Sequence, residues 1–271
     1  MLRDLRITLG GGFILLLLVA ALFAHWLSPF DPLEQDLLIA TASPTQEPGH
    51  YLGTDSLGRD VLSRLIYASR TALTVAFVAS ILACLLGTTL GLLAGYFGGW
   101  WELVISRMVD IWMAFPPVLL SILLVAVLGS GLHSVIIAIV VIDWTRFARV
   151  TRAEAQQQTK LEYVDAATAV GMGRSSILYR EILPNVLPVV LVLLSLEMGI
   201  AVIVEAILSF VGLSVSTDTP TWGGMIAEGR QIIHQAWWVL VFPLGAIFLT
   251  VLAFNQLGDG LRQRLDPMLK R

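Results

Sequence analysis

Long apolar runs alternate with polar intervals along this chain. The first run, Leu9–Leu27, is long enough for a helix to cross the hydrocarbon core of a bilayer at about 1.5 Å per residue. Five later runs follow at about 71–95, 103–128, 132–147, 185–211 and 236–257. The pattern therefore predicts an all-α integral membrane protein with six transmembrane helices.

The first run has the basic flank of a secretory signal peptide, because Arg3 and Arg6 precede it. Cleavage requires a small-x-small pattern, however, and Leu22-Phe23-Ala24 does not supply one. We therefore expect residues 1–27 to form a retained first helix. The basic flank places the N-terminus in the cytoplasm.

Residues 28–70 are predicted to lie outside the membrane. In the first half of this segment a long helix is excluded by Pro29, Pro32, Pro44 and Pro48. Asp55 is then placed to cap an amphipathic helix over 56–70, whose apolar face would lie on the membrane surface or against the other spans. A core of five helices is expected at 71–257 and a cytoplasmic tail at 258–271.

Two of the runs contain residues that constrain packing. Glycine recurs at every fourth residue from Gly87 to Gly95 and gives a flat face on which another helix can pack closely. In the third run, Pro116-Pro117 predicts a kink. Arg107 and Asp110 lie three residues apart on one helical face, so they can form an ion pair or take part in gating.

Two acids, Glu197 and Glu205, interrupt the fifth run. Their spacing places them about 12 Å apart along a helix and on neighbouring faces. A carboxylate that faces lipid costs about 3 kcal/mol, so both are expected to face the bundle interior or a translocation path. For Glu205 a hydrogen-bonded tether to a neighbouring helix is an equal alternative.

A polar interval at 150–184, between the fourth and fifth runs, has the pattern of two short helices joined by a turn. Good helix formers with an early acid cover 163–170, and Gly171 follows as a C-terminal cap. A second helix is expected from about 175 to 183, where Pro184 would end it.

Small side chains at Ala166 and Ala167 leave one face of the first short helix thin, so another protein can approach its backbone closely. Together with Asp165, Gly171 and Leu183-Pro184, these alanines resemble the coupling loop of bacterial ABC importer permeases. That loop reads Glu-Ala-Ala, three residues, Gly, nine residues and Ile-x-Leu-Pro.

The match to the coupling loop has two departures. Asp165 replaces the family's Glu and keeps its charge, and Glu181 stands where Ile is usual. The resemblance implies that residues 163–185 seat in a cleft of an ATP-hydrolysing subunit and couple it to the transmembrane helices.

Three further stretches resemble one branch of that family, the dipeptide, oligopeptide and nickel permeases. They are Leu52–Asp60 (LGTDSLGRD), Ser209–Leu213 (SFVGL) and Trp222-Gly223. The resemblance implies a type I ABC importer (MetI-like) permease fold in the bacterial inner membrane. It also implies three kinds of partner: a homologous second permease, two ATP-binding subunits that hold ATP and Mg²⁺, and an external substrate-binding protein.

Substrate identity follows less directly from the resemblance. Peptide permeases and nickel or metal-chelate permeases share these stretches, because the external binding protein makes most of the selection. We favour peptides, with a metal importer as the alternative.

Composition agrees with a membrane protein and argues against several other classes. Hydrophobic residues make up 56% of the chain and charged residues 14%, and the mean hydropathy is +0.81. With a net charge of −3 and no basic cluster, a nucleic-acid partner is not expected. One cysteine, Cys84, and four scattered histidines do not suggest a metal site.

Motifs for catalysis or nucleotide binding are not found in the sequence. Gly53 and Gly58 are spaced like the glycines of a phosphate loop, but the Lys and the hydroxyl residue that grip phosphate and Mg²⁺ do not follow them. We therefore expect no enzyme and no bound cofactor, and the energy must come from partners or from an ion gradient. A stand-alone secondary transporter or channel is the rival class, and it would usually show inverted repeats, which we do not detect.

The distribution of Lys and Arg sets the expected orientation. Thirteen of the 17 fall in segments expected in the cytoplasm, and four fall in segments expected outside. Because positive charge is enriched on the cytoplasmic side of membrane proteins, both termini are expected there.

Overall fold

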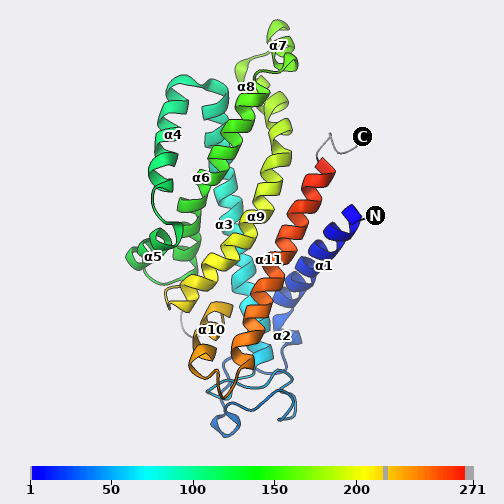
Figure 1. Ribbon diagram of the computed structural model, residues 1–271, viewed down its shortest axis with the longest axis vertical. Coiled ribbons are helices and arrows are strands. Elements are labelled where there is room, and N and C mark those ends of the chain that lie inside the picture. The colour runs from blue at the N-terminus through cyan, green and yellow to red at the C-terminus, as the bar shows by residue number, and fades with distance from the viewer. Residues whose placement is uncertain (1, 216–218, 266–271) are drawn as a thin grey trace.

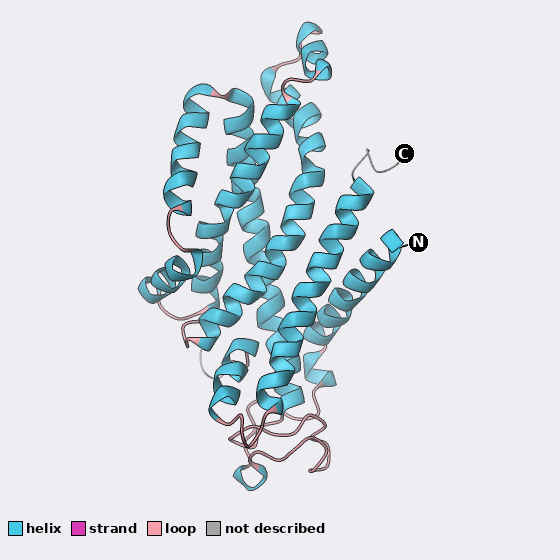
Figure 2. Cartoon of the chain, in the orientation of Figure 1, coloured by secondary structure: helices cyan, strands magenta, loops and turns pink. Residues whose placement is uncertain are grey.

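The computed structural model describes residues 2–215 and 219–265, so residues 266–271 of the predicted tail lie outside the described residues. Within the described ranges the chain is helical and contains no strand, as Figure 2 shows. The helices form an elongated bundle. Helix α7 lies at one end and the loops of residues 28–60 lie at the other (Figure 1).

The helices of the first half of the chain are α1 (Leu2–Leu22), α2 (Ala24–Leu27), the 3-10 turn η1 (Leu37–Ile39), α3 (Val61–Phe97), α4 (Gly99–Met113) and α5 (Pro117–Leu128). Those of the second half are α6 (Leu132–Gln158), α7 (Glu162–Ala169), α8 (Arg174–Ile177), the π-helical turn η2 (Leu178–Ile182), α9 (Leu183–Phe210), α10 (Trp222–Gln231) and α11 (Trp238–Leu265). Helix α3 is central and contacts α1, α4, α6 and α9, while α11 packs between α9 and α1 (Figure 1).

All six predicted apolar runs form helices. Three helices are long and apolar enough to cross a membrane: α3, the continuous helix Arg174–Phe210, and α11 as far as Arg264. Helices α4 and α5 together would make a fourth span with a break. In α1 the apolar part, Arg6–Leu22, is shorter, and the second half of α6 is rich in charged residues.

Helices α3 and α6 approach closely along the predicted glycine stripe. A Cβ atom at Gly87 would lie 2.2 Å from the backbone oxygen of Trp144, and one at Gly91 would lie 2.6 Å from that of Ala148. At Gly95 the distance to the facing backbone would be 2.7 Å. Backbone atoms cannot move aside as a flexible side chain can, so only glycine fits this contact.

The amphipathic helix expected at 56–70 is not a separate element. Helix α3 begins where the Asp60 carboxylate accepts a hydrogen bond of 2.7 Å from the Ser63 N–H, and it continues into the second run without a break. Gly58 explains the later start, because its φ of +73° belongs to a turn and not to a helix. Asp55 caps no helix. It accepts hydrogen bonds from the backbone of this turn.

Prolines act differently at two places in the bundle. At Pro116-Pro117 the chain bends by 89° between α4 and α5, so the predicted kink is confirmed. At Pro184 the predicted helix end is wrong. The Leu183 N–H bonds to the carbonyl of Leu178, five residues back, and Pro184 falls in the first turn of α9, where a missing N–H is tolerated. The chain therefore continues as one helix from α8 into α9.

Candidate functional site

Helix α7 carries the predicted coupling residues and projects beyond its neighbours at one end of the molecule (Figure 1). Its buried side chain is Val164, which is 6% exposed and packs with Ile177 and Ile182 of the segment that follows. The same apolar cluster includes Ala155 of α6 and Leu92 of α3. Through Val164, α7 joins this apolar cluster, and its main element contact is with α8.

Gly171 ends α7 as predicted. Its φ is +86°, its N–H donates to the carbonyl of Thr168, and the N–H of Met172 donates to that of Ala167. These two bonds form a Schellman cap, which needs a left-handed residue at the position of Gly171. The space around Gly171 is open, since a Cβ atom there would meet nothing within 4 Å. Its backbone conformation, and not crowding, is what requires glycine.

The outward face of α7 combines one acid with small and apolar side chains. Asp165 and Ala166 are exposed and Ala167 is half-buried. Val170, which follows α7, is 85% exposed. Because α7 projects beyond the long apolar helices, this exposed face is a candidate surface for another protein.

The second half of the coupling motif supports the first. Leu183 is half-buried and packs against the cluster that holds Val164, while Pro184 is exposed at the start of α9. The structure thus brings Asp165, Ala166 and Ala167 together on α7. Leu183 packs against the apolar cluster to which α7 contributes Val164.

Glu197 on α9 is paired with Arg146 on α6. The Nη1 of Arg146 donates to both carboxylate oxygens of Glu197, at 3.0 and 3.1 Å. Asp143, one turn earlier on α6, has an oxygen 4.0 Å from the Nε of the same arginine. The Glu197 side chain is 3% exposed, so it lies in the interior of the bundle.

Glu205, the second acid of α9, has only hydroxyl partners among the described residues. Its carboxylate accepts a hydrogen bond of 2.5 Å from Ser209 and one of 3.2 Å from Ser214 in the loop after α9. The residue is 1% exposed. This geometry favours the tether over the translocation path, although the tether holds the chain's own loop and not a neighbouring helix.

Arg107 and Asp110 lie on α4, where both side chains are mostly exposed. Their closest charged atoms are 4.0 Å apart, and Arg149 of α6 comes within 3.9 Å of the same aspartate. An exposed pair at such distances contributes little to stability. The two residues therefore remain candidates for contact with a partner or for gating.

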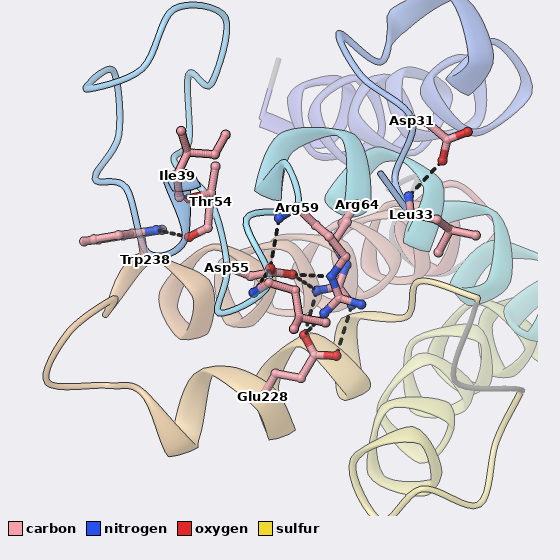
Figure 3. Close-up of polar contacts among 10 residues, drawn as sticks. Asp31, Leu33, Ile39, Thr54, Asp55, Arg59, Arg64, Glu228 and Trp238 are labelled. Atoms are coloured by element: carbon pink, nitrogen blue, oxygen red, sulfur yellow. Dashed lines mark hydrogen bonds and ion pairs between the residues drawn. The ribbon is translucent and has the colours of Figure 1, made fainter. Parts of the chain in front are cut away.

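The structure also contains a buried charge network at the opposite end, which the sequence did not predict (Figure 3). Arg59 donates from Nε to Asp55 at 2.7 Å and from Nη2 to Glu228 at 2.8 Å. Arg64 donates to Glu228 at 2.6 and 3.2 Å and also to Asp55. Two cations and two anions thus join the turn before α3 to α10.

Glu228 is the partly accessible member of this network, and its pKa is lowered. Burial by itself would raise the pKa of this carboxyl, but the hydrogen bonds and charges of Arg64 and Arg59 outweigh that effect. Glu228 is therefore ionised at neutral pH.

The other motifs of this end pack around the same network. The indole N–H of Trp222 donates to the Leu65 carbonyl on α3, and that of Trp238 donates to the Thr54 carbonyl. A Cβ atom at Gly223 would lie 2.1 Å from the Ala206 backbone oxygen, so the glycine lets α10 press against α9. The stretch Leu52–Asp60 is thus joined to α10 through Arg59 and Glu228, and Trp222-Gly223 at the start of α10 contacts α3 and α9.

These features define a class: a helical membrane-embedded subunit with a surface for another protein at one end and an ion-paired cap at the other. Among the described residues no group of three side chains is arranged to hold a metal ion. The family model "Binding-protein-dependent transport system inner membrane component" matches residues 87–271, and "N-terminal TM domain of oligopeptide transport permease C" matches residues 7–48. The chain belongs to this family of transport permeases.

Curated relatives are similar over nearly the whole chain. The glutathione transport system permease protein GsiD of Pectobacterium atrosepticum is 41% identical over 261 residues, which cover 96% of this chain and 86% of the relative. The dipeptide transport system permease protein DppC of Alkalihalophilus pseudofirmus is 40% identical over 253 residues, covering 93% and 83%. The di/tripeptide transport system permease protein DppC of Pseudomonas aeruginosa is 40% identical over 262 residues, covering 95% and 86%.

Solved structures confirm the predicted fold. An amino acid ABC transporter matches with a TM-score of 0.60 and 17% identity, over 75% of this chain and 94% of that one. The MetNI methionine ABC transporter in an inward-facing conformation matches with a TM-score of 0.59 and 18% identity, over 75% and 96%. The chain has the type I ABC importer (MetI-like) permease fold.

Proposed function

We propose that this chain forms half of the translocation pathway of an ATP-driven importer of dipeptides or oligopeptides. The exposed surface of α7 carries the proposal, because it offers a capped, anchored helix with Asp165 and Ala166 facing outward at one end of the molecule. The relatives named for glutathione, dipeptides and tripeptides favour a short peptide as substrate over nickel or a metal chelate.

The proposed complex has four kinds of component. A second, homologous permease completes the pathway. Two ATP-binding subunits hold ATP and Mg²⁺, and each contacts the α7 surface of one permease. A substrate-binding protein delivers the peptide at the end formed by residues 28–60. The ends of the described chain lie toward the α7 half of the bundle (Figure 1), which supports a cytoplasmic location for both termini.

The mechanism follows from the anchoring of α7. When ATP closes the two ATP-binding subunits, they displace α7, and its contact with α8 passes the displacement to the continuous helix from α8 to α9 and to the apolar cluster around Val164. The bundle then opens outward to receive substrate and returns inward after hydrolysis. The free energy of transport is thus supplied by a partner.

Gly171→Val tests the coupling role of α7. A β-branched residue at a φ of +86° is strained by about 1–2 kcal/mol, so the Schellman cap should be lost while the rest of the bundle stays folded. In proteoliposomes that hold the full complex, we expect ATP hydrolysis to continue and peptide uptake per ATP to fall about tenfold. Uptake of a labelled dipeptide and release of phosphate are measured in parallel.

Gly173→Val is the matched control. Gly173 also has open space around it, but its φ is −67°, which valine adopts readily. Uptake per ATP should stay near the wild-type value. Normal coupling in the Gly171 variant would contradict the role of α7, and uptake by the permeases without ATP-binding subunits would show a secondary transporter or channel.

A further inference from the structure

Among the described residues, the helices on either side of the coupling segment are joined by one ion pair, in which Glu197 is buried and Arg146 is 30% exposed. Helix α6 leads into α7, and the continuous helix from α8 to α9 leads out of it (Figure 1). Arg146 of α6 and Glu197 of α9 face each other with contacts of 3.0 and 3.1 Å. We call these two residues the α6–α9 clamp.

Apolar packing also joins these helices, but it resists sliding less than the clamp does. Phe147 of α6 belongs to the same apolar cluster as Val186 and Val190 of α9. Apolar contacts are not directional and can re-form after a small shift. A buried carboxylate has no such freedom, because separation from its arginine leaves an unpaired charge away from water. With 3% of its side chain exposed, Glu197 has almost no access to water that could replace Arg146.

Arg146 also has an acidic neighbour on its own helix, α6. Asp143 lies one turn earlier on α6, with an oxygen 4.0 Å from the Nε of Arg146, and it is 5% exposed. The guanidinium therefore stands between a carboxylate on α6 and a carboxylate on α9. Its position is set before any load is applied to α7.

We propose that the α6–α9 clamp makes the two helices that flank the coupling segment move as one body. Without it, part of a displacement of α7 would be lost as sliding of α6 along α9, and the far half of the bundle would move less. Arg146 and Glu197 are thus positioning residues for the transport cycle. This inference rests on the proposed function of the chain as an ATP-driven permease.

Removal of either charge tests the clamp in the full complex. Arg146→Gln and Glu197→Gln are each reconstituted with the partner subunits, and labelled dipeptide uptake and phosphate release are measured together. We expect complexes that still hydrolyse ATP but transport about tenfold less peptide per ATP. A role in packing alone would reduce the amount or melting temperature of the complex and leave this ratio unchanged, which would overturn the proposal.

Two further variants guard against simple misfolding. The double variant Arg146→Gln/Glu197→Gln leaves no unpaired partner in the clamp, so its ratio should be no lower than that of either single variant. Additive losses would show that the two residues act separately and would overturn the proposal.

Arg146→Lys keeps the charge but has a different shape, and an intermediate value of peptide uptake per ATP is expected. If the Gln variants do not assemble, a wild-type value of peptide uptake per ATP in Arg146→Lys counts against the clamp.

Asp259→Asn is the control. It removes a carboxylate charge as Glu197→Gln does, but Asp259 lies on α11, is 57% exposed, and its ion partner is Arg6 of α1 at 3.8 Å. Its ratio should equal that of the wild type. The wild-type complex tests the proposed function separately, because uptake that does not depend on ATP would contradict that function. If ATP hydrolysis drives uptake equally well in the wild type and in the Gln variants, only the clamp proposal is overturned.

Discussion

Single charged residues hold together the end of this protein that residues 28–60 form. Glu228 receives Arg59 and Arg64 at once, and Asp55 holds the same two arginines from the other side (Figure 3). Each charge of the network has a partner of opposite sign, so burial does not leave an isolated ion. Such a network is strongly affected by the loss of one member, because the others stay buried without it.

Acidification should expose the contribution of Glu228 to stability. Its folded-state pKa lies below the ordinary carboxyl value, so the stabilisation is complete above that ordinary value, near 4.3, and is lost as the pH falls through the lowered pKa. We expect the melting temperature of the purified protein to lose this contribution below about pH 4. Light-scattering-corrected thermal melts between pH 3 and pH 7 measure it.

Glu228→Gln should remove part of that acid sensitivity and lower stability at pH 7. Because a third of the side chain is exposed, we expect a loss of about 2 kcal/mol, less than for a fully buried ion pair. Glu34→Gln, a change to an exposed acid of residues 28–60, is the control. An unchanged melting temperature at pH 7 would mean that the network carries no stability.

At the scale of elements, the contact of α3 with α6 depends on backbone proximity. The glycine stripe was predicted because its four-residue spacing is a local pattern, and the kink at Pro116-Pro117 was predicted for the same reason. The helix start after Gly58 could not be predicted in this way. A Cβ atom at Gly58 would lie 1.8 Å from the Asp36 backbone oxygen, a residue far away in sequence.

Gly91→Ala should weaken the α3–α6 contact. The added methyl would lie 2.6 Å from the Ala148 backbone oxygen, and overpacking of this kind costs about 1–3 kcal/mol. We expect a lower melting temperature and less folded protein in the membrane. Gly245→Ala in α11 is the control, because nothing lies within 4 Å of its added methyl. Equal melting temperatures for the two variants would contradict the close contact.

At the scale of the molecule, the two ends of the bundle differ in how far they could be predicted from the sequence. The sequence predicted the helices and the cap at Gly171, since each follows from short spacings. The coupling role of Asp165, Ala166 and Ala167 follows from a family resemblance and stays a prediction. It did not predict the continuous helix through Pro184, because the π-helical turn that accommodates the proline leaves no simple pattern. It also did not predict the charge network of Figure 3, whose members Arg64 and Glu228 are 164 residues apart.

The proposed orientation is measurable with single cysteines in a Cys84→Ser background. Leu38→Cys at the external end and Val170→Cys beside α7 replace side chains that are 95% and 85% exposed. A membrane-impermeant maleimide should label the first in intact spheroplasts and the second only after lysis. Labelling of the second in intact spheroplasts would reverse the topology.

The unbroken helix from Arg174 to Phe210 has one more consequence. It connects the α7 end to the region of Glu205 and Ser214, so a displacement at either end can be transmitted to the other. Linkage requires that two sites coupled in this way change each other's affinity by the same factor. If a substrate-loaded binding protein changes the affinity of the complex for nucleotide, nucleotide should therefore change the affinity of the complex for that binding protein by the same factor.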